Sequence, residues 1–280
     1  MRRLIDVATL IAAIALAATP ANAEQALPSQ PLRVCADPNN LPFSNHDQAG
    51  FENKLAKMIA QAFGETLTYT WWAQRRGFIR HTLKAGDCDL VMGVPADYKL
   101  VERTHPYYRS TYVFVTRQDS HLDISTLTDD RLRHLRIGVH LIGDDGNNTP
   151  PAHVLGTLGI VDNVRGYMIY GDYRQPDPPA RLIKAVEDGD IDVAAAWGPL
   201  AGYFVKLSKI PLSVSAIEDD GRFAPQRLQF SIAMGVRKGD DALRDRLNEF
   251  IDQHRSEIKT LLESYGVPLI GSQQAASEEH

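Results

Sequence analysis

Leu182–Pro199 reads LIKAVEDGDIDVAAAWGP, and this stretch decides the class of fold. Its apolar residues first recur at the spacing of one helix face, which predicts a helix over 180–188. The apolar run that follows predicts a buried strand over 191–196, and a further helix is predicted over 200–206. Strands that alternate with helices at this spacing indicate right-handed crossovers and a parallel sheet.

The alternation of strands and helices occurs in two separate parts of the chain. In the first part, strands and helices are predicted in turn at 32–36, 52–63, 67–72, 77–85 and 89–93. In the second part, the order repeats at 135–140, 151–158, 164–169, 180–188, 191–196 and 200–206. Two β-rich runs, 111–117 and 228–236, stand outside both series, and a long helix over 241–263 is predicted to close the chain.

Two β/α series joined by two lone strands indicate two lobes with two crossover segments and a central cleft. We therefore predict an α/β fold with two parallel or mixed sheets. Residues 24–115 would form the first part of lobe 1, and residues 116–228 would form lobe 2. Residues 229–280 would supply the return crossover and the C-terminal helix that completes lobe 1.

The first 23 residues have the pattern of a secretory signal peptide. Arg2 and Arg3 precede an apolar run, and Ala21-Asn22-Ala23 is a small-residue cleavage site. The apolar run is shorter than the roughly 18 residues that a membrane span needs, so an uncleaved anchor is the less favoured alternative. We therefore expect cleavage after Ala23, a periplasmic location and no membrane insertion.

Charge and cysteine content narrow the class of partner and the compartment. The chain carries 30 Lys and Arg against 35 Asp and Glu, a formal net charge of −5. A mildly acidic exported protein is not built to hold nucleic acid, so its partners should be small molecules or other exported proteins. We expect Cys35 and Cys88 to form a disulfide in an oxidising compartment, with two separately buried thiols as the alternative.

Four segments carry a resemblance to a known family. They are GFENKLAKMIAQAFG (50–64), LKAGDCDLVMG (83–93), HPYYRSTYVFVTR (105–117) and the stretch 182–199 quoted above. In this order they resemble the type II periplasmic solute-binding proteins of ABC importers, over nearly the whole chain after the signal peptide. The resemblance implies the two-lobed type II fold with two crossover strands and a central cleft.

A narrower resemblance points to one branch of that family. Its segments are CADPNNLPFSN (35–45), TWWAQRRGFIR (70–80), VMGVPADY (91–98) and PYYRSTYVFVTR (106–117). They are similar to the solute-binding-like proteins associated with quinoprotein (methanol) dehydrogenases, the MoxJ/XoxJ-type branch. The resemblance implies a periplasmic accessory protein that helps a PQQ-dependent dehydrogenase to mature or become active. The alternatives are a transport receptor for a small solute that is not an amino acid and, third, a small enzyme.

The sequence departs from the family's amino-acid receptors at three anchor positions. Asp97 lies nine residues before Pro106, where the family's carboxylate-binding arginine would stand. The second lobe offers GDDG (143–146) at the turn that would help to bind the carboxylate, and its two acids would repel that group. Trp197 stands where the family's ammonium-binding acid would be, so amino-acid binding is disfavoured.

Ligands of open α/β sheets bind beyond the carboxyl ends of the strands. The residues expected there or at the rim of the cleft are Asp37, Asn39, Asn40, Phe43, Arg75, Arg76, Phe78, Gly93, Pro95, Tyr107, His140, Asp144, Asn147 and Trp197. Trp197 either closes the sheet end as a core residue or stacks on a flat or apolar partner in the cleft. The two arginines are either solvated or, with Phe78, part of a protein interface.

Metal and catalytic signals are weak. The loop GDDGNNT (143–149) clusters oxygen ligands but lacks the spaced carboxylates of a calcium loop, so a helix-capping turn is favoured over a metal site. The sequence also lacks the common hydrolase, zinc-protease and nucleotide-binding motifs. We therefore expect no catalytic residues, no cofactor and a monomer whose partner is a periplasmic quinoprotein dehydrogenase or a small solute.

Overall fold

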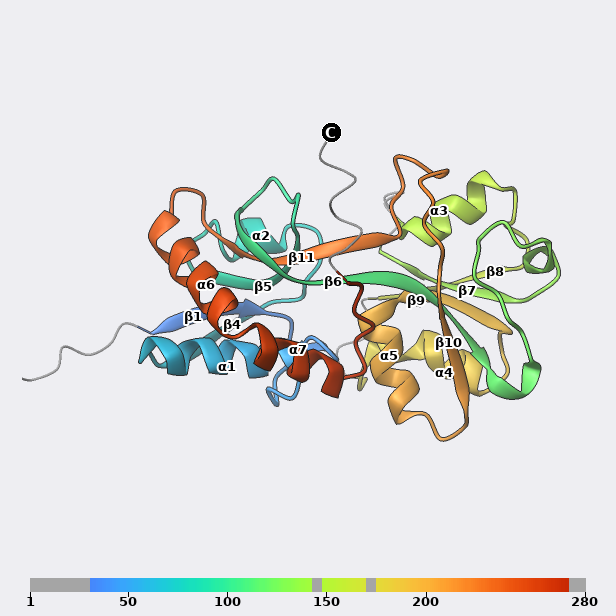
Figure 1. The fold of residues 1–280 in the computed structure, drawn as a ribbon, viewed down its shortest axis with the longest axis horizontal. Helices are drawn as coiled ribbons and strands as arrows, with labels where there is room; N and C mark the ends of the chain where they lie inside the picture. The colour runs from blue at the N-terminus through green and yellow to red at the C-terminus, as the bar shows by residue number, and fades with distance from the viewer. Residues whose placement is uncertain (1–30, 143–147, 170–174, 272–280) are drawn as a thin grey trace, which may run out of the picture.

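The computed structural model describes residues 31–142, 148–169 and 175–271, and the predicted signal peptide lies outside them. Two lobes lie side by side, connected by the long strands that cross the middle of Figure 1. Lobe 1 contains β1 (Leu32–Ala36), α1 (Phe51–Phe63), β4 (Leu67–Trp71), α2 (Phe78–His81), β5 (Leu90–Pro95), α6 (Asp241–Gln253) and α7 (Arg255–Ser264). Lobe 2 contains β7 (Ile137–Leu141), α3 (Pro150–Thr157), β8 (Val164–Met168), α4 (Arg181–Glu187), β9 (Val193–Trp197), α5 (Gly198–Leu207) and β10 (Leu212–Ala216).

Each lobe has a parallel sheet segment of the kind that the β/α alternation predicts. In lobe 1, β1 lies between β4 and β5 and is parallel to both. In lobe 2, β7 lies between β8 and β9 and is parallel to both. Parallel strands are usually buried on both faces, which accounts for the apolar runs of β5 and β9. A short hairpin of β2 (Asn39–Asn40) and β3 (Ser44–Asn45) follows β1.

The two crossover strands are β6 (Glu102–Arg117) and β11 (Gln229–Val236). The first part of β6 pairs with β11, from Glu102 with Val236 to Thr111 with Gln229. Its last residues pair with β9 on one edge and with β10 on the other. Because β6 belongs to both halves, the two expected sheets form one connected sheet of nine strands.

Separate apolar clusters form the cores of the two lobes. The lobe 1 core packs α1, α6 and α7 onto the sheet through residues such as Phe51, Leu55, Leu247 and Ile258. Lobe 2 has a cluster on each face of its sheet, one containing Phe114 and the other containing Val115. Trp197 and Phe230 pack against both the lobe 1 core and one lobe 2 cluster, so the lobes share aromatic contacts at their junction.

The structure differs from the predicted elements where local hydrogen bonds interrupt a helix. The predicted helix over 241–263 is two helices, because His254 has non-helical φ and ψ of −115° and 25° and its ring hydrogen-bonds to the Phe250 carbonyl. The predicted helix over 77–85 stops after one turn, because the Thr82 hydroxyl donates to the Phe78 carbonyl and turns follow. The predicted strand over 111–117 is the end of the longer β6.

Cys35 and Cys88 form the expected disulfide, with Cα atoms 5.5 Å apart and a sequence separation of 53 residues. Both residues are buried, at 2% and 0% exposure, in a cluster on the outer face of the lobe 1 sheet. The bond connects the end of β1 to the segment that enters β5, which is a neighbouring strand of the lobe 1 sheet.

Replacing both cysteines with alanine should lower the free energy of unfolding by about 4 kcal/mol, because the unfolded chain regains the entropy of a loop of this length. Urea unfolding of the oxidised protein and of the double variant measures the difference. Alkylation of two thiols in the unreduced, denatured protein would contradict the disulfide.

Candidate functional site

A small cavity of about 170 Å³ lies where the two lobes meet. Its lining residues, which define the cleft cavity, are Asn40, Phe43, Glu52, Gln74, Gly93, Val94, Pro95, Tyr108, Trp197 and Ile232. Most of them come from the carboxyl ends of lobe 1 strands and from the start of α1, whereas Trp197 comes from lobe 2 and Ile232 from β11. The cavity therefore occupies the position at which open α/β sheets bind ligands.

Glu52 is the one ionisable acid or base among the residues that line the cleft cavity, apart from the phenol of Tyr108. It is the second residue of α1 and lies one turn before buried Leu55, so the apolar face of the helix carries it inward. Its exposure is 8%, and burial, together with the nearby charge of Asp37, raises its pKa to about 8. Glu52 is therefore largely a neutral acid at pH 7.

Gly93 makes room for the Glu52 side chain. A Cβ atom at position 93 would lie 2.4 Å from Glu52 Oε1, so no larger residue fits there without displacing the carboxyl group. A second close approach fixes the start of α1, because a Cβ at Gly50 would lie 2.0 Å from the Phe43 carbonyl oxygen. The carboxyl position is thus fixed by the backbone on two sides.

Polar groups around Glu52 are only partly satisfied by the protein. Asp37 is buried and accepts hydrogen bonds from the backbone N–H groups of Asn39 (2.8 Å) and Gln74 (2.7 Å). The Asn40 amide lies 3.4 Å from the side-chain oxygen of Gln74. In the described part of the chain, the Tyr107 hydroxyl and Asn53 Nδ2 are buried without a hydrogen-bond partner.

Trp197 contributes both to the core and to the lining of the cleft cavity. It ends β9, is half-buried, and packs against the cores of both lobes. Its ring centroid lies 5.3 Å from that of Tyr112 and 5.8 Å from that of Phe230, while part of the side chain lines the cleft cavity. Phe43 also lines the cavity, and its ring lies 5.4 Å from that of Phe51.

Asn39 joins the two lobes beside the cleft. Its side-chain amide donates to the Gln175 carbonyl at 2.8 Å, and its side-chain oxygen accepts from the Asp177 N–H at 3.3 Å. The β2–β3 hairpin of lobe 1 is thereby held against the segment that leads into α4 of lobe 2.

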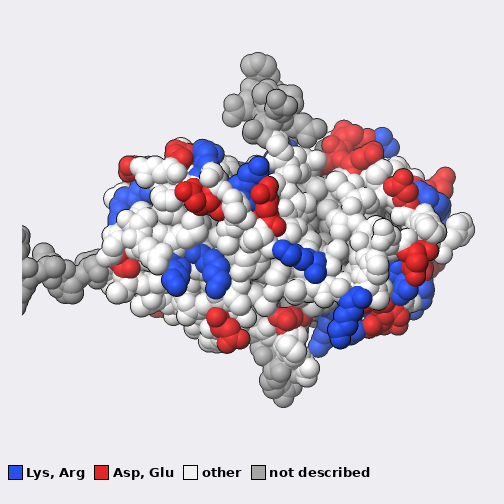
Figure 2. Space-filling view, turned by 60° about the horizontal axis from the view of Figure 1, so that its bottom comes forward, with Lys and Arg blue, Asp and Glu red and all other residues white. Residues whose placement is uncertain are grey.

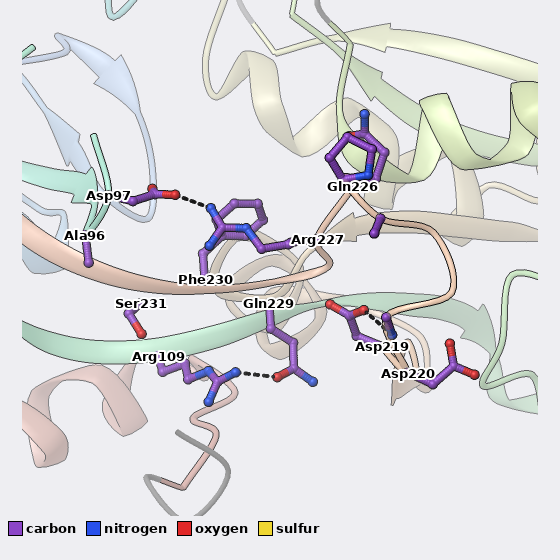
Figure 3. A pocket seen from close by; sticks show the side chains of 13 residues that line it. Ala96, Asp97, Arg109, Asp219, Asp220, Gln226, Arg227, Gln229, Phe230 and Ser231 are labelled. Carbon is purple, nitrogen blue, oxygen red and sulfur yellow. Dashed lines mark hydrogen bonds and ion pairs between the residues drawn. The ribbon is translucent and has the colours of Figure 1, made fainter. Parts of the chain in front are cut away.

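A groove of about 780 Å³ runs along the crossover strands (Figure 3). Across it, the Arg227 guanidinium forms an ion pair with Asp97 and lies 5.3 Å from the centroid of the Phe230 ring. Arg109 donates to Gln229 at 3.0 Å on the other side of the strands. Asp97 thus pairs with a cation from the segment that enters β11.

The arginines expected at the rim line a separate pocket of about 460 Å³. Arg75 and Arg76 are exposed there beside Leu100, whereas Phe78 is buried in the cluster around the disulfide. Gly93 and Pro95 line both this arginine pocket and the cleft cavity. The arginine pocket is therefore distinct from the cleft cavity, although the two share residues of β5.

Two expected site residues, Tyr107 and His140, do not line the cleft cavity, and two others lie outside the described residues. Tyr107 lines a pocket between β6 and α7, and its neighbour Tyr108 lines both that pocket and the cleft cavity. His140 is 3% exposed, and its Nε2 lies 3.2 Å from the Pro179 carbonyl oxygen. Burial lowers the pKa of His140 to about 4, so it is a neutral core residue. Asp144 and Asn147 lie outside the described residues.

Three further observations concern the surface and the described part of the chain. Lys, Arg, Asp and Glu side chains are interspersed over the face shown in Figure 2, without a broad patch of one sign. Within residues 31–142, 148–169 and 175–271, no group of three His, Cys, Asp or Glu side chains is placed to hold a metal ion. Over the same ranges, no helix combines the length and the apolar character that crossing a membrane requires.

This fold and its interlobe cavity are those of a two-lobed periplasmic binding protein. The chain belongs to the bacterial extracellular solute-binding proteins, family 3, whose sequence profile matches residues 32–267. Over 268 residues it is 34% identical to Protein MoxJ of Methylorubrum extorquens, which covers 90% of this chain and 86% of that protein.

Two solved structures agree with this assignment. The periplasmic binding protein XoxJ from Methylobacterium extorquens AM1 matches with a TM-score of 0.71 at 34% identity, over 86% of this chain and all of that one. MxaJ from Methlophaga aminisulfidivorans MPT also has a TM-score of 0.71, at 28% identity, over 85% of this chain and 100% of its own. The chain is therefore similar to the MoxJ/XoxJ branch, as its motifs indicated.

Opposite effects of Glu52 and His140 predict the dependence of stability on pH. Because the pKa of Glu52 is raised, its contribution to the free energy of unfolding is fully present below pH 4.5 and is lost as the pH rises to about 8. Because the pKa of His140 is lowered, its contribution to the free energy of unfolding is fully present above pH 6.5 and is lost as the pH falls to about 4. Between pH 6.5 and 8 the loss due to Glu52 is therefore not offset by His140.

Glu52→Gln should remove that loss. Over this interval the wild type should lose about 2 kcal/mol of unfolding free energy more than the variant, at about 1.4 kcal/mol per pH unit. Urea unfolding at pH 6.5 and 8 measures it, with exposed Glu257→Gln as the matched control. An equal pH dependence in wild type and Glu52→Gln would contradict the assignment.

Proposed function

We propose that this protein is a periplasmic accessory of a PQQ-dependent alcohol dehydrogenase and assists the maturation or activation of that enzyme. The observation that carries the proposal is the similarity to MoxJ along 90% of the chain, together with a structural match to XoxJ. Membership of an extracellular solute-binding family and the N-terminal signal pattern support the periplasmic location.

The chemistry of the cleft supports this role over that of an amino-acid receptor. No Lys or Arg is among the residues that line the cleft cavity, so a free α-carboxylate has no charged partner there. Glu52 would repel that group when ionised, and Trp197 offers it an aromatic surface rather than a charged partner. The cleft is thus available to a segment of a partner protein.

The arginine pocket supplies a second surface suited to a protein partner. Exposed Arg75, Arg76 and Leu100 line a pocket that shares Gly93 and Pro95 with the cleft cavity. Arginine and apolar side chains together are typical of the central parts of protein interfaces. A partner segment could therefore enter the cleft while its flanks contact this rim.

Affinity capture from the periplasm of the native host tests the proposal. The tagged mature protein should enrich a quinoprotein dehydrogenase. In a strain that lacks the gene for this accessory protein, the periplasmic extract should have lower dehydrogenase activity. Trp197→Ala should reduce capture about tenfold or more, as expected for a buried aromatic contact. Trp72→Ala is the matched control, because Trp72 is 46% exposed and lies outside the cleft cavity.

Thermal unfolding of both tryptophan variants separates lost binding from lost folding. The proposal would be overturned if the tagged protein captured no dehydrogenase and deletion of its gene left dehydrogenase activity unchanged. Enrichment of a permease and an ATPase instead would identify a transport receptor.

A further inference from the structure

The floor of the cleft cavity contains an acid that the protein leaves without a partner. Glu52 is more than nine-tenths buried, and no described residue donates a hydrogen bond to its carboxyl group or forms an ion pair with it. Buried carboxyl groups are normally hydrogen-bonded, and an exception calls for an explanation. Gly93 and the start of α1 hold this group at the cavity wall, so it is available to whatever enters.

The other walls favour a compact cation. Phe43, Tyr108 and Trp197 line the cavity around the acid, and aromatic rings attract ammonium groups through their electron-rich faces. No cationic side chain lines the cavity, and the charge of Asp37 adds to the negative potential at Glu52. The volume of about 170 Å³ is below the roughly 300–1,000 Å³ of pockets for drug-sized ligands, so it suits a head group.

We propose that the cleft cavity is a binding site for an alkylammonium group, with Glu52 as its carboxylate and Phe43, Tyr108 and Trp197 as its aromatic walls. Two sources present this chemistry: a free small amine and a lysine side chain of a protein that enters the cleft. The inference goes beyond the proposed function, because it concerns the chemical group that the cavity itself binds. Small probes therefore test it without any dehydrogenase.

The affinity of the cavity for an ammonium group should rise with pH, because the surroundings of Glu52 raise its pKa. The titratable groups that act on it are Asp37, Tyr69, Tyr107 and Tyr108, from the β1 turn, β4 and β6, and none of them is cationic. A cation binds the ionised acid, so binding below pH 8 releases a proton. For a pKa of about 8, affinity should rise about 20-fold between pH 6.5 and 8.5.

Calorimetric titration of the mature protein with tetramethylammonium chloride, at constant ionic strength, tests the site at both pH values. We expect saturable binding whose affinity rises about 20-fold from pH 6.5 to pH 8.5. At pH 6.5 binding should release about one proton, which is measured by comparing the binding heat in two buffers of different ionisation enthalpy. Glu52→Gln should weaken binding at pH 8.5 at least tenfold and abolish the pH dependence. Glu257→Gln should bind as the wild type does.

Two further probes identify the source of the ammonium group. Tighter binding of Nα-acetyl-lysine methylamide than of ethylammonium supports a lysine side chain, whereas equal or weaker binding supports a free amine. Absence of saturable binding by all three probes overturns the inference, as does unchanged binding in Glu52→Gln. If the wild-type protein captures the dehydrogenase but binds none of the probes, this inference is overturned and the proposed function is not.

Discussion

One strand holds the molecule together. β6 pairs with β11 in its first part and with β9 and β10 in its last residues, so its backbone hydrogen bonds belong to both lobes. Trp197 and Phe230 pack beside this strand against the cores of both lobes. The cleft cavity exists because the lobe 1 strands end at this junction and β9 arrives there from the other side. Its geometry therefore depends on the pairing of β6 more than on any contact within one lobe.

The fold could be predicted wherever its signals are local. The helix period and the apolar runs predict α1, β1, β5 and most of lobe 2 to within a few residues, because these elements bury a continuous face. The first part of β6 was missed because ERTHPYYRS (102–110) has no apolar alternation, and its strand form depends on pairing with β11. β10 was missed for a similar reason, as an edge strand whose side chains are mostly half-exposed.

The site could be predicted only in outline. The turn after β1, Gly93, Pro95 and Trp197 were placed at the cleft because strand ends meet there. Glu52 was overlooked although its position three residues before Leu55 puts it on the buried helix face, and this spacing was the available signal. His140 is the next-to-last residue of β7, but no pattern in the sequence shows that its ring is buried in lobe 2. Side-chain direction at a strand end depends on packing from distant segments.

The pairing of β5 with β11 makes the lobe 1 sheet depend on the last part of the chain. Pro95 lies opposite Ile232, so the lobe 1 sheet is completed by a segment more than a hundred residues further along the chain. The strands β7 to β10 lie close together in sequence, and lobe 2 can form while the C-terminal segment is still being translocated. Until β11, α6 and α7 have emerged, the apolar residues of β1 and α1 lack part of the side chains that cover them in the completed core. For an exported chain, the disulfide between β1 and β5 therefore limits the conformations of lobe 1 during that interval.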